Sequence, residues 1–195
     1  MVNPTPKNSL LLIIDIQEKL SRAMDQAVLS KVCAQINLLA TLADELKIPI
    51  FLTEQYPQGL GPTIEPIKKI LEGKKFAQQG KLAFGCCDDA AFNKKLKTFR
   101  RKNIILVGME THVCVYLTVL GLLKQRYHPF VVSDAVISRA KFYYKNGLDL
   151  ARQAGAILTN TETLLFQLMA KSGTPTFKKI SALLKESLLR STTNG

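Results

Sequence analysis

The sequence predicts an α/β protein folded as a three-layer α/β/α sandwich. Short apolar runs rich in Leu, Ile and Val alternate with longer segments whose apolar residues repeat at i, i+3 and i+4. The short runs are continuously apolar, which is typical of strands covered on both faces. Strands that alternate with helices favour a largely parallel sheet joined by right-handed crossovers.

Five apolar runs are predicted to be strands, and a weaker sixth strand is predicted at KLAF, residues 81–84. Each run is short and is bounded by polar or turn-forming residues. The five runs are LLLII at 10–14, IPIFLT at 48–53, NIILVG at 103–108, PFVVS at 129–133 and AILT at 156–159.

Helices are predicted between these strands. In the first, Ser30 is placed to cap the opening turn, and the apolar residues that follow have helical spacing. A capping-box pattern at 159–162 marks the turn from the last strand into the next helix. The apolar positions of the first helix are Val32, Ile36, Leu39, Ala43 and Leu46, and further helices are expected at 88–101, 111–126, 143–154, 161–171 and 176–189.

Length and composition indicate one domain over residues 1–195. A chain of 195 residues with 47% hydrophobic content can bury one sizeable core. The four cysteines lack the spacing of a disulfide scaffold or a zinc knuckle, which favours a reducing compartment. The first residues match neither a secretory leader nor a membrane span, so we expect a cytoplasmic protein that does not engage membranes.

The net charge of +12 raises the question of nucleic-acid binding. Residues 68–102 hold eleven basic and three acidic residues, a local excess of +8. These residues fall on the polar faces of predicted helices, without interleaved aromatic residues or a known nucleic-acid motif. We therefore interpret the segment as a solvated surface or an attractor of anionic ligands, and do not expect nucleic acid as a partner.

Chemically capable side chains follow several predicted strands. Asp15 follows the first strand, Gln55 follows the second, and the GMETHVC stretch follows the strand at 103–108. The weak strand brings Lys81 to the same edge, and Asp134 follows the strand at 129–133. Because ligands bind at the carboxyl ends of parallel strands, an acid, a base and a thiol are expected to meet there.

Cys114 is the candidate nucleophile. It lies in the first turns of a predicted helix, where free amides and the helix dipole favour a thiolate and a developing oxyanion. Asp15 is the natural proton acceptor for this thiol, and Lys81 is the natural group to keep that acceptor ionised.

The residues alone leave plainer alternatives open. Cys114 could be an ordinary core cysteine, Asp15 could cap a helix that begins near Ile16, and Lys81 could be solvated. His112 points about 200° away from Cys114 on a helix, so a structural or substrate-facing role is expected for it rather than a Cys-His dyad.

Six stretches together resemble the isochorismatase-like cysteine hydrolase family, and within it the isochorismatase-domain-containing branch. The resemblance covers nearly the whole chain, and the set is specific although each stretch alone would be weak. The stretches are LLIIDIQEKL, TEQYPQGLGPT, KLAF, VGMETHVCVYLTVL, VVSDAVISR and GAILTNTETLLFQL.

The resemblance implies a Rossmann-like sheet of about six parallel strands and a catalytic triad of Asp15, Lys81 and Cys114. It also implies a cis peptide bond between Met109 and Glu110, and an oxyanion hole made by the amides of Glu110 and Cys114. Gln17 is expected to help arrange the site. Substrate contacts are expected from six residues near the triad: Gln17, Gln55, Tyr56, Phe84, Met109 and Thr111.

The implied reaction is hydrolysis of a small amide or related C–N bond through a thioester on the cysteine. Relatives that cleave isochorismate lack this cysteine, so true isochorismatase activity is not expected. Nicotinamidases of the superfamily bind a metal through a loop after the second strand, but the loop at 54–63 here contains no His. With only two His in the chain, we expect neither a catalytic metal nor a cofactor.

The sequence also departs from the family pattern. Gly85 stands where relatives generally carry Ser, and the adjacent Cys86 and Cys87 are expected to be packed thiols rather than a redox pair. The alternative to an enzyme is a catalytically quiet binding or scaffold protein of the same fold. The expected partners are a small-molecule substrate and further copies of the chain, with the apolar segment at 164–170 as a candidate interface.

Overall fold

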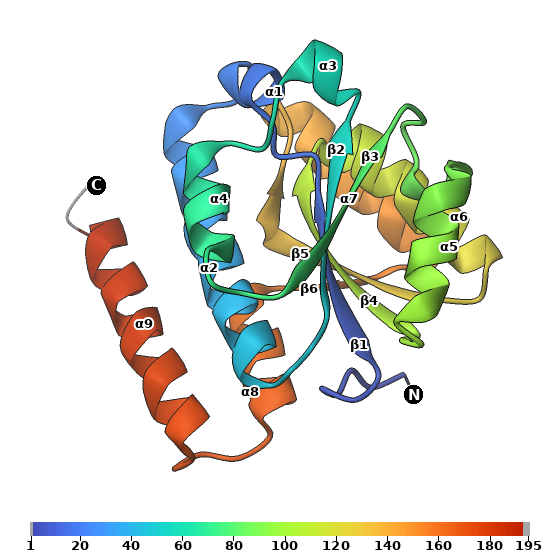
Figure 1. The fold of residues 1–195 in the computed structure, drawn as a ribbon. Helices are drawn as coiled ribbons and strands as arrows, with labels where there is room; N and C mark the ends of the chain where they lie inside the picture. The colour runs from blue at the N-terminus through green and yellow to red at the C-terminus, as the bar shows by residue number, and fades with distance from the viewer. Residues whose placement is uncertain (1, 193–195) are drawn as a thin grey trace.

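A computed structural model describes residues 2–192, with side chains placed up to residue 186. Its centre is a six-stranded sheet in the order β3-β2-β1-β4-β5-β6, with every strand pair parallel (Figure 1). The predicted parallel α/β sandwich is therefore confirmed. The strands are β1 Ser9–Ile14, β2 Ile50–Gln55, β3 Phe76–Lys81, β4 Asn103–Met109, β5 His128–Ile137 and β6 Ile157–Thr159.

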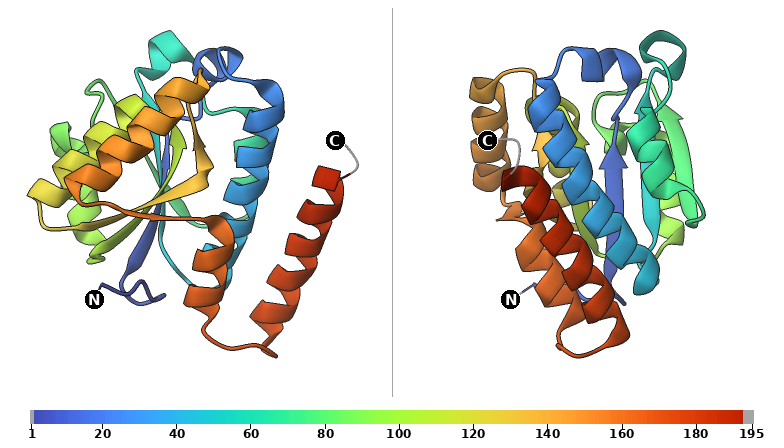
Figure 2. Two further views of the ribbon diagram at one scale, coloured as in Figure 1. Left: turned by 180° about the vertical axis from the view of Figure 1, so that it is seen from behind. Right: turned by 90° about the vertical axis from the view of Figure 1, so that its left-hand side faces the viewer.

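Helices cover both faces of the sheet, and α9 lies outside α2 as a further layer (Figure 2). One face carries α2 Gln26–Glu45, α4 Glu65–Leu71, α8 Thr161–Met169 and α9 Pro175–Thr192. The other carries α5 Ala90–Thr98, α6 Tyr116–Lys124 and α7 Lys141–Ala154. Four short helical segments complete the described part: α1 Glu18–Arg22, α3 Pro57–Leu60, the 3-10 turn η1 Cys86–Asp88 and the π-helical turn η2 Thr111–Val115.

The side chains of the continuous apolar strands are divided between two hydrophobic cores, one on each face of the sheet. In β1, Leu10 and Leu12 join the cluster under α5, α6 and α7, while Leu11 and Ile13 join the cluster under α2 and α8. Successive side chains of a strand point to opposite faces, so a strand buried on both faces must be apolar at every position. This explains the run that the sequence shows before Asp15.

The sixth strand and two helix starts differ from the sequence predictions. β3 ends at Lys81 instead of starting there, and its side chains alternate between exposed and half-buried because it is an edge strand. Asp25 caps α2 by accepting a bond from the Val28 amide, so the observed cap lies five residues before Ser30, the predicted cap. Asn160, rather than the preceding Thr, caps α8.

Two further expectations are corrected. Asp134 lies inside β5 and accepts bonds from the amide and hydroxyl of Thr161, so it anchors the start of α8 and does not join the triad. Half of the apolar side chains of the candidate interface at 164–170 are buried within this chain, namely Leu164, Leu165 and Leu168, whereas Phe166 is exposed.

Among the described residues, α2 alone has the length and apolar composition that a membrane span requires, and half of that window is buried inside the fold. Its inner side chains pack on the sheet and its outer side meets α9, which is the placement of a core helix.

The strand order reverses between β1 and β4. The chain adds β2 and β3 on one side of β1, then returns to place β4, β5 and β6 on the other. Such a switch point opens a crevice beyond the carboxyl ends of the two central strands. Asp15 follows β1 and Cys114 lies shortly after β4, so the topology brings both to this crevice.

Candidate functional site

Asp15 lies at the base of the site and is fully buried. Its backbone turns sharply out of β1 with φ of 53°, and its amide donates to the Thr53 carbonyl at 3.1 Å. The Thr53 hydroxyl donates to Asp15 Oδ1 at 2.7 Å, and Lys81 Nζ lies 2.6 Å from Oδ2. Because α1 begins only at Glu18, with Gln17 as its cap, Asp15 does not act as a helix cap.

Lys81 ends β3 with its ammonium group inside the protein. Nζ donates to Asp15, to Gln55 Oε1 at 2.7 Å, and to the carbonyls of Ala83 and Phe84 at 3.3 and 3.2 Å. Burial is the largest single influence and opposes the charged form, but the combined effect of Asp15, Cys86 and Cys114 outweighs it and raises the pKa of Lys81. Lys81 is therefore a fixed cation rather than a solvated surface lysine.

Cys114 lies in the π-helical turn η2 and is 5% exposed. Burial raises the pKa of its thiol, the neighbouring Asp15 carboxylate raises it further, and Lys81 only partly opposes them. The expectation of a dipole-stabilised thiolate is therefore wrong. The protein holds this cysteine as a thiol that hydrogen-bonds toward Asp15, because desolvation of the anion outweighs the nearby cation.

The backbone before Cys114 has the geometry that the family resemblance implies. The peptide bond between Met109 and Glu110 is cis. The Glu110 carbonyl accepts bonds from the amides of Val113 and Val115 at 3.1 and 3.2 Å, and this pattern skips the amide of Cys114.

Gln17 and Gln55 hold the segments around the site together through side-chain hydrogen bonds. Gln17 Nε2 donates to the carbonyls of Gln55 and Gly61 at 2.9 and 2.7 Å, and its Oε1 accepts from the Gln55 amide at 2.7 Å. Gln55 Nε2 in turn donates to the Leu82 carbonyl at 2.6 Å, opposite its bond to Lys81. The side-chain amides of Gln17 and Gln55 are both hydrogen-bonded within the protein. The geometry therefore gives these two residues positioning roles and not direct contacts with a substrate.

The other predicted substrate contacts divide into exposed and buried groups. Tyr56 and Phe84 are exposed beside Lys81, and the Tyr56 amide donates to the Lys81 carbonyl at 2.8 Å. Met109 is fully buried. Thr111 is also buried, yet its hydroxyl has no hydrogen-bond partner within the described part of the chain.

Several residues of the site were not singled out from the sequence. Thr53 holds Asp15, and its polar side chain at the end of an apolar strand was the available signal. Thr118 links the two cysteine segments, because it donates to the Cys114 carbonyl at 2.6 Å and accepts from the Cys86 amide at 3.0 Å. As predicted, Cys86 is a buried free thiol; it lies 3.9 Å from the Thr53 hydroxyl.

Arg139 is the second unpredicted contributor. Its amide donates to Glu110 Oε2 at 2.9 Å, and its guanidinium pairs with Oε1 at 2.5 Å. The guanidinium also lies 5.0 Å from the centre of the Tyr143 ring, which stacks on His112 at 4.6 Å. Contacts from the residues between β5 and α7 and from the start of α7 therefore hold the segment that carries Cys114 in place.

Within residues 2–192, no group of three His, Cys, Asp or Glu side chains has the arrangement of a metal site. His112 lies beyond the carboxyl end of β4, where its Nδ1 is 3.1 Å from the Ser138 hydroxyl. His128 begins β5, at the opposite end of the sheet.

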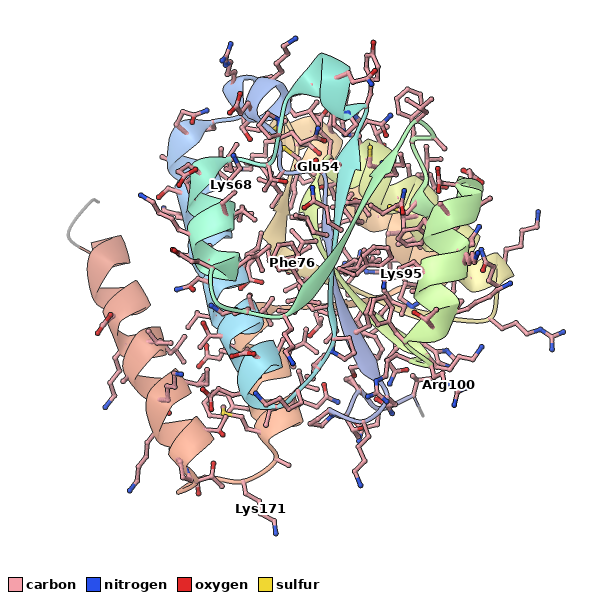
Figure 3. All side chains as sticks on the ribbon, in the orientation of Figure 1. Glu54, Lys68, Phe76, Lys95, Arg100 and Lys171 are labelled. Atoms are coloured by element: carbon pink, nitrogen blue, oxygen red, sulfur yellow. The ribbon has the colours of Figure 1, made fainter. Side chains whose placement is uncertain are left out.

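A groove of about 580 Å³ lies between α4 and strands β2 and β3, and none of its lining residues belongs to the triad. Figure 3 labels Glu54, Lys68 and Phe76, which line it. The same view shows Lys68 on α4 and Lys95 on α5, on opposite sides of the sheet. The basic residues between 68 and 102 therefore do not form one continuous patch.

Comparison with known proteins identifies the family and the fold. The isochorismatase domain model matches residues 9–163. "Isochorismatase family protein 1A" of Dictyostelium discoideum is 36% identical over 94% of this chain and 89% of its own length. "Secreted isochorismatase effector Isc1" of Phytophthora sojae is also 36% identical, over 94% of this chain and 87% of its own length.

Solved structures give the same result. A protein described as MAR1 ribonuclease from Caenorhabditis elegans superimposes with a TM-score of 0.85 at 35% identity, covering 93% of this chain and 92% of its own. An Escherichia coli protein described as an octameric hydrolase of unknown specificity has the same fold, with a TM-score of 0.84 at 20% identity and coverage of 100% and 97%. The chain belongs to the isochorismatase family of hydrolases.

Proposed function

We propose that this protein is a metal-independent cysteine hydrolase that cleaves a small amide or related C–N bond. The observation that carries the proposal is the convergence of three buried groups at the switch point: the Asp15 carboxylate, the Lys81 ammonium and the Cys114 thiol. A buried ion pair beside a nearly inaccessible thiol is costly to maintain, and such arrangements are concentrated at catalytic sites.

The first half of the reaction forms a thioester. Cys114 Sγ attacks the carbonyl carbon while its proton passes to the Asp15 carboxylate, and the amides of Glu110 and Cys114 receive the oxyanion. The raised pKa of Cys114 fits this order, because the proton leaves only as the bond to carbon forms. Asp15 then returns the proton to the leaving nitrogen, the C–N bond breaks, and the amine departs.

The second half releases the acid. A water molecule gives a proton to Asp15 and attacks the thioester carbonyl, and the same amides hold the second oxyanion. The C–S bond then breaks and the proton on Asp15 returns to the sulfur, which restores the resting thiol. Lys81 stays charged throughout and favours return of the proton from Asp15 to the leaving nitrogen or sulfur, because it stabilises the ionised carboxylate.

The test is trapping of the acyl-enzyme. Wild-type protein incubated with a panel of small amides and hydroxylamine is expected to give hydroxamates, and peptide mapping by mass spectrometry of acid-quenched protein without hydroxylamine should place the acyl group on Cys114. Cys114→Ala should lower kcat by roughly 10³-fold or more. Cys33→Ala is the matched control, because Cys33 is a buried free thiol of α2 outside the site. Turnover that survives Cys114→Ala would contradict the proposal.

A second candidate function, action on RNA, is favoured by one observation. The Caenorhabditis elegans relative is described as a ribonuclease, and the present chain carries a net charge of +12. If RNA is the substrate, binding of a labelled RNA oligomer should weaken steeply as salt rises, and cleavage should need Asp15. We place amide hydrolysis first because a thiol nucleophile has no role in the transfer of an RNA phosphate to its own 2′-hydroxyl.

The location and assembly of the protein stay predictions. We propose a cytoplasmic homo-oligomer, although the relative from Phytophthora sojae is described as secreted. Light scattering of the purified chain measures the assembly state directly, and fractionation of cells that express it measures the location.

A further inference from the structure

Large apolar side chains are exposed on segments that contact the turns carrying Lys81 and Cys114. Eleven such side chains are exposed among the residues the structure describes, and five of them belong to segments that touch the site. This clustering is informative because single exposed apolar residues are normal, whereas a contiguous group marks a binding surface. The five, called the apolar rim below, are Tyr56, Leu82, Phe84, Phe142 and Tyr143.

One half of the apolar rim is bound directly to Lys81. Tyr56 is joined to Lys81 through its backbone amide, and the Phe84 carbonyl accepts a bond from Lys81 Nζ. The Leu82 carbonyl is held by Gln55, which also binds Lys81. The backbone thus turns its polar groups inward onto the ammonium and leaves the side chains outside, with Leu82 73% and Phe84 60% exposed.

The other half of the rim is attached to the turn that carries Cys114. His112 stacks on Tyr143, and Phe142 meets Tyr143 edge-on with ring centres 5.8 Å apart. Phe142, at the second position of α7, is 73% exposed. Two apolar ridges, one beside Lys81 and one at the start of α7, therefore belong to segments that contact those carrying Lys81 and Cys114.

The charges between these ridges are already neutralised. Lys81 pairs with Asp15, and Arg139 pairs with Glu110 through two hydrogen bonds. A charged group on the substrate would give up its hydration without gaining a free counter-charge here, which is costly. An apolar group would gain from burial against the rim.

We propose that the substrate is an uncharged amide whose acyl part is an apolar chain or ring of several carbons. The apolar rim holds this acyl part, and Leu82 and Phe84 are its specificity-determining residues. The inference rests on the proposed amide hydrolysis at Cys114 and adds the class of acyl group that the site selects.

The test compares acyl groups of matched size and different charge. Ammonia release is measured with acetamide, hexanamide and adipamate, the last being hexanamide with a terminal carboxylate. Full burial of a methylene is worth about fourfold in affinity, so four added methylenes, each half-buried at the rim, should raise kcat/KM by about 15-fold for hexanamide over acetamide. Adipamate should lose that gain.

Variants connect this preference to the rim. Leu82→Ala and Phe84→Ala should each lower the ratio of hexanamide to acetamide kcat/KM by about fourfold, mainly through KM. Phe166→Ala is the matched control, since this exposed aromatic residue lies on α8 outside the rim. It should leave the ratio unchanged.

A binding measurement separates this proposal from the hydrolase proposal. Calorimetric titration of Cys114→Ala with hexanamide and adipamate needs no turnover, and tighter binding of hexanamide that Phe84→Ala abolishes would support the substrate class even if nothing is hydrolysed. Turnover that favours adipamate would overturn the inference and leave the hydrolase intact. So would light scattering that shows an oligomer which Leu82→Ser and Phe142→Ser dissociate, because a second copy would then occupy the rim.

Discussion

At the scale of single residues, the site depends on how three buried groups share one proton. Asp15 has Thr53 on one carboxylate oxygen and Lys81 on the other, so its position is fixed from both sides. Cys114 meets this pair as a neutral thiol whose pKa is raised first by burial and then by Asp15. A Cys-His ion pair would begin with the thiolate already formed, whereas this arrangement forms it only during attack.

Asp15→Asn separates the reactivity of the thiol from turnover. Loss of the carboxylate removes one cause of the raised pKa of Cys114, while Lys81 still favours the thiolate, so the pKa should fall. Iodoacetamide should label Cys114 faster at pH 8 in this variant, although amide turnover is lost with the base.

Cys33 serves as the internal control for this experiment. Burial alone raises the pKa of Cys33 to about 11, so its slow labelling should be the same in both proteins. Slower labelling of Cys114 in Asp15→Asn would show that Asp15 does not face the thiol.

Thr111→Val tests the unpaired hydroxyl beside the candidate oxyanion hole. The Thr111 hydroxyl is buried without a partner, so an apolar isostere should leave the free energy of unfolding unchanged or slightly higher. If the hydroxyl contacts substrate, kcat/KM should fall by roughly tenfold while stability holds. Thermal unfolding and steady-state kinetics measure the two effects, and an unchanged kcat/KM would remove Thr111 from the site.

At the scale of secondary-structure elements, the turn η2 is held by its neighbours. A Cβ on Gly147 would lie 2.7 Å from the backbone of Thr111 and His112, so α7 packs directly on η2. A Cβ on Gly108 would lie 2.1 Å from the Ile14 carbonyl, so β4 and β1 also meet closely beside Asp15. Glycines at these two contacts allow Cys114 and Asp15 to come together.

Arg139→Ala should remove the ion pair that holds the Glu110 side chain without unfolding the chain. Because the Glu110 amide is a proposed oxyanion donor, kcat should fall by about tenfold with little change in KM, and Arg139→Lys should recover part of it. Arg152→Ala is the control, since Arg152 forms an exposed ion pair with Asp149 on α7 and should have no effect. An equal loss in both variants would argue against a positioning role.

At the scale of the whole molecule, α9 is separate from the catalytic end of the sheet. It lies outside α2 as an extra layer, with Ile180 buried and Lys179 paired with Glu45 (Figure 2). The strand ends that carry Asp15 and Lys81 lie on the far side of α2 from this helix. Stability and catalysis are therefore expected to respond to different parts of the chain.

Ile180→Ala should lower the free energy of unfolding by about 2–4 kcal/mol, the usual effect of emptying a buried aliphatic site. The activity of the folded fraction should not change. Denaturant unfolding and kinetics below the transition provide the measurement, with exposed Lys178→Ala as the neutral control. A loss of kcat at full folding would reveal a connection between α9 and the site that the packing does not suggest.

The sequence by itself determined the layered parallel sheet and the edge at which the site lies. Continuous apolar runs such as the one before Asp15 can only be buried on both faces, and the carboxyl ends of parallel strands share one edge. The position of β3 was wrong by one strand length because its exposed edge pattern resembles a loop. The family motifs then predicted a triad of Asp15, Lys81 and Cys114; in the structure Lys81 binds Asp15, and both lie near Cys114.

Tertiary structure alone decided the raised pKa of the Cys114 thiol, the ion pair between Arg139 and Glu110, and the separation of Lys68 from Lys95 across the sheet. Each depends on neighbours that are distant in the sequence. The sign of a pKa shift is set by the balance of burial against surrounding charge, and that balance exists only once the chain has folded.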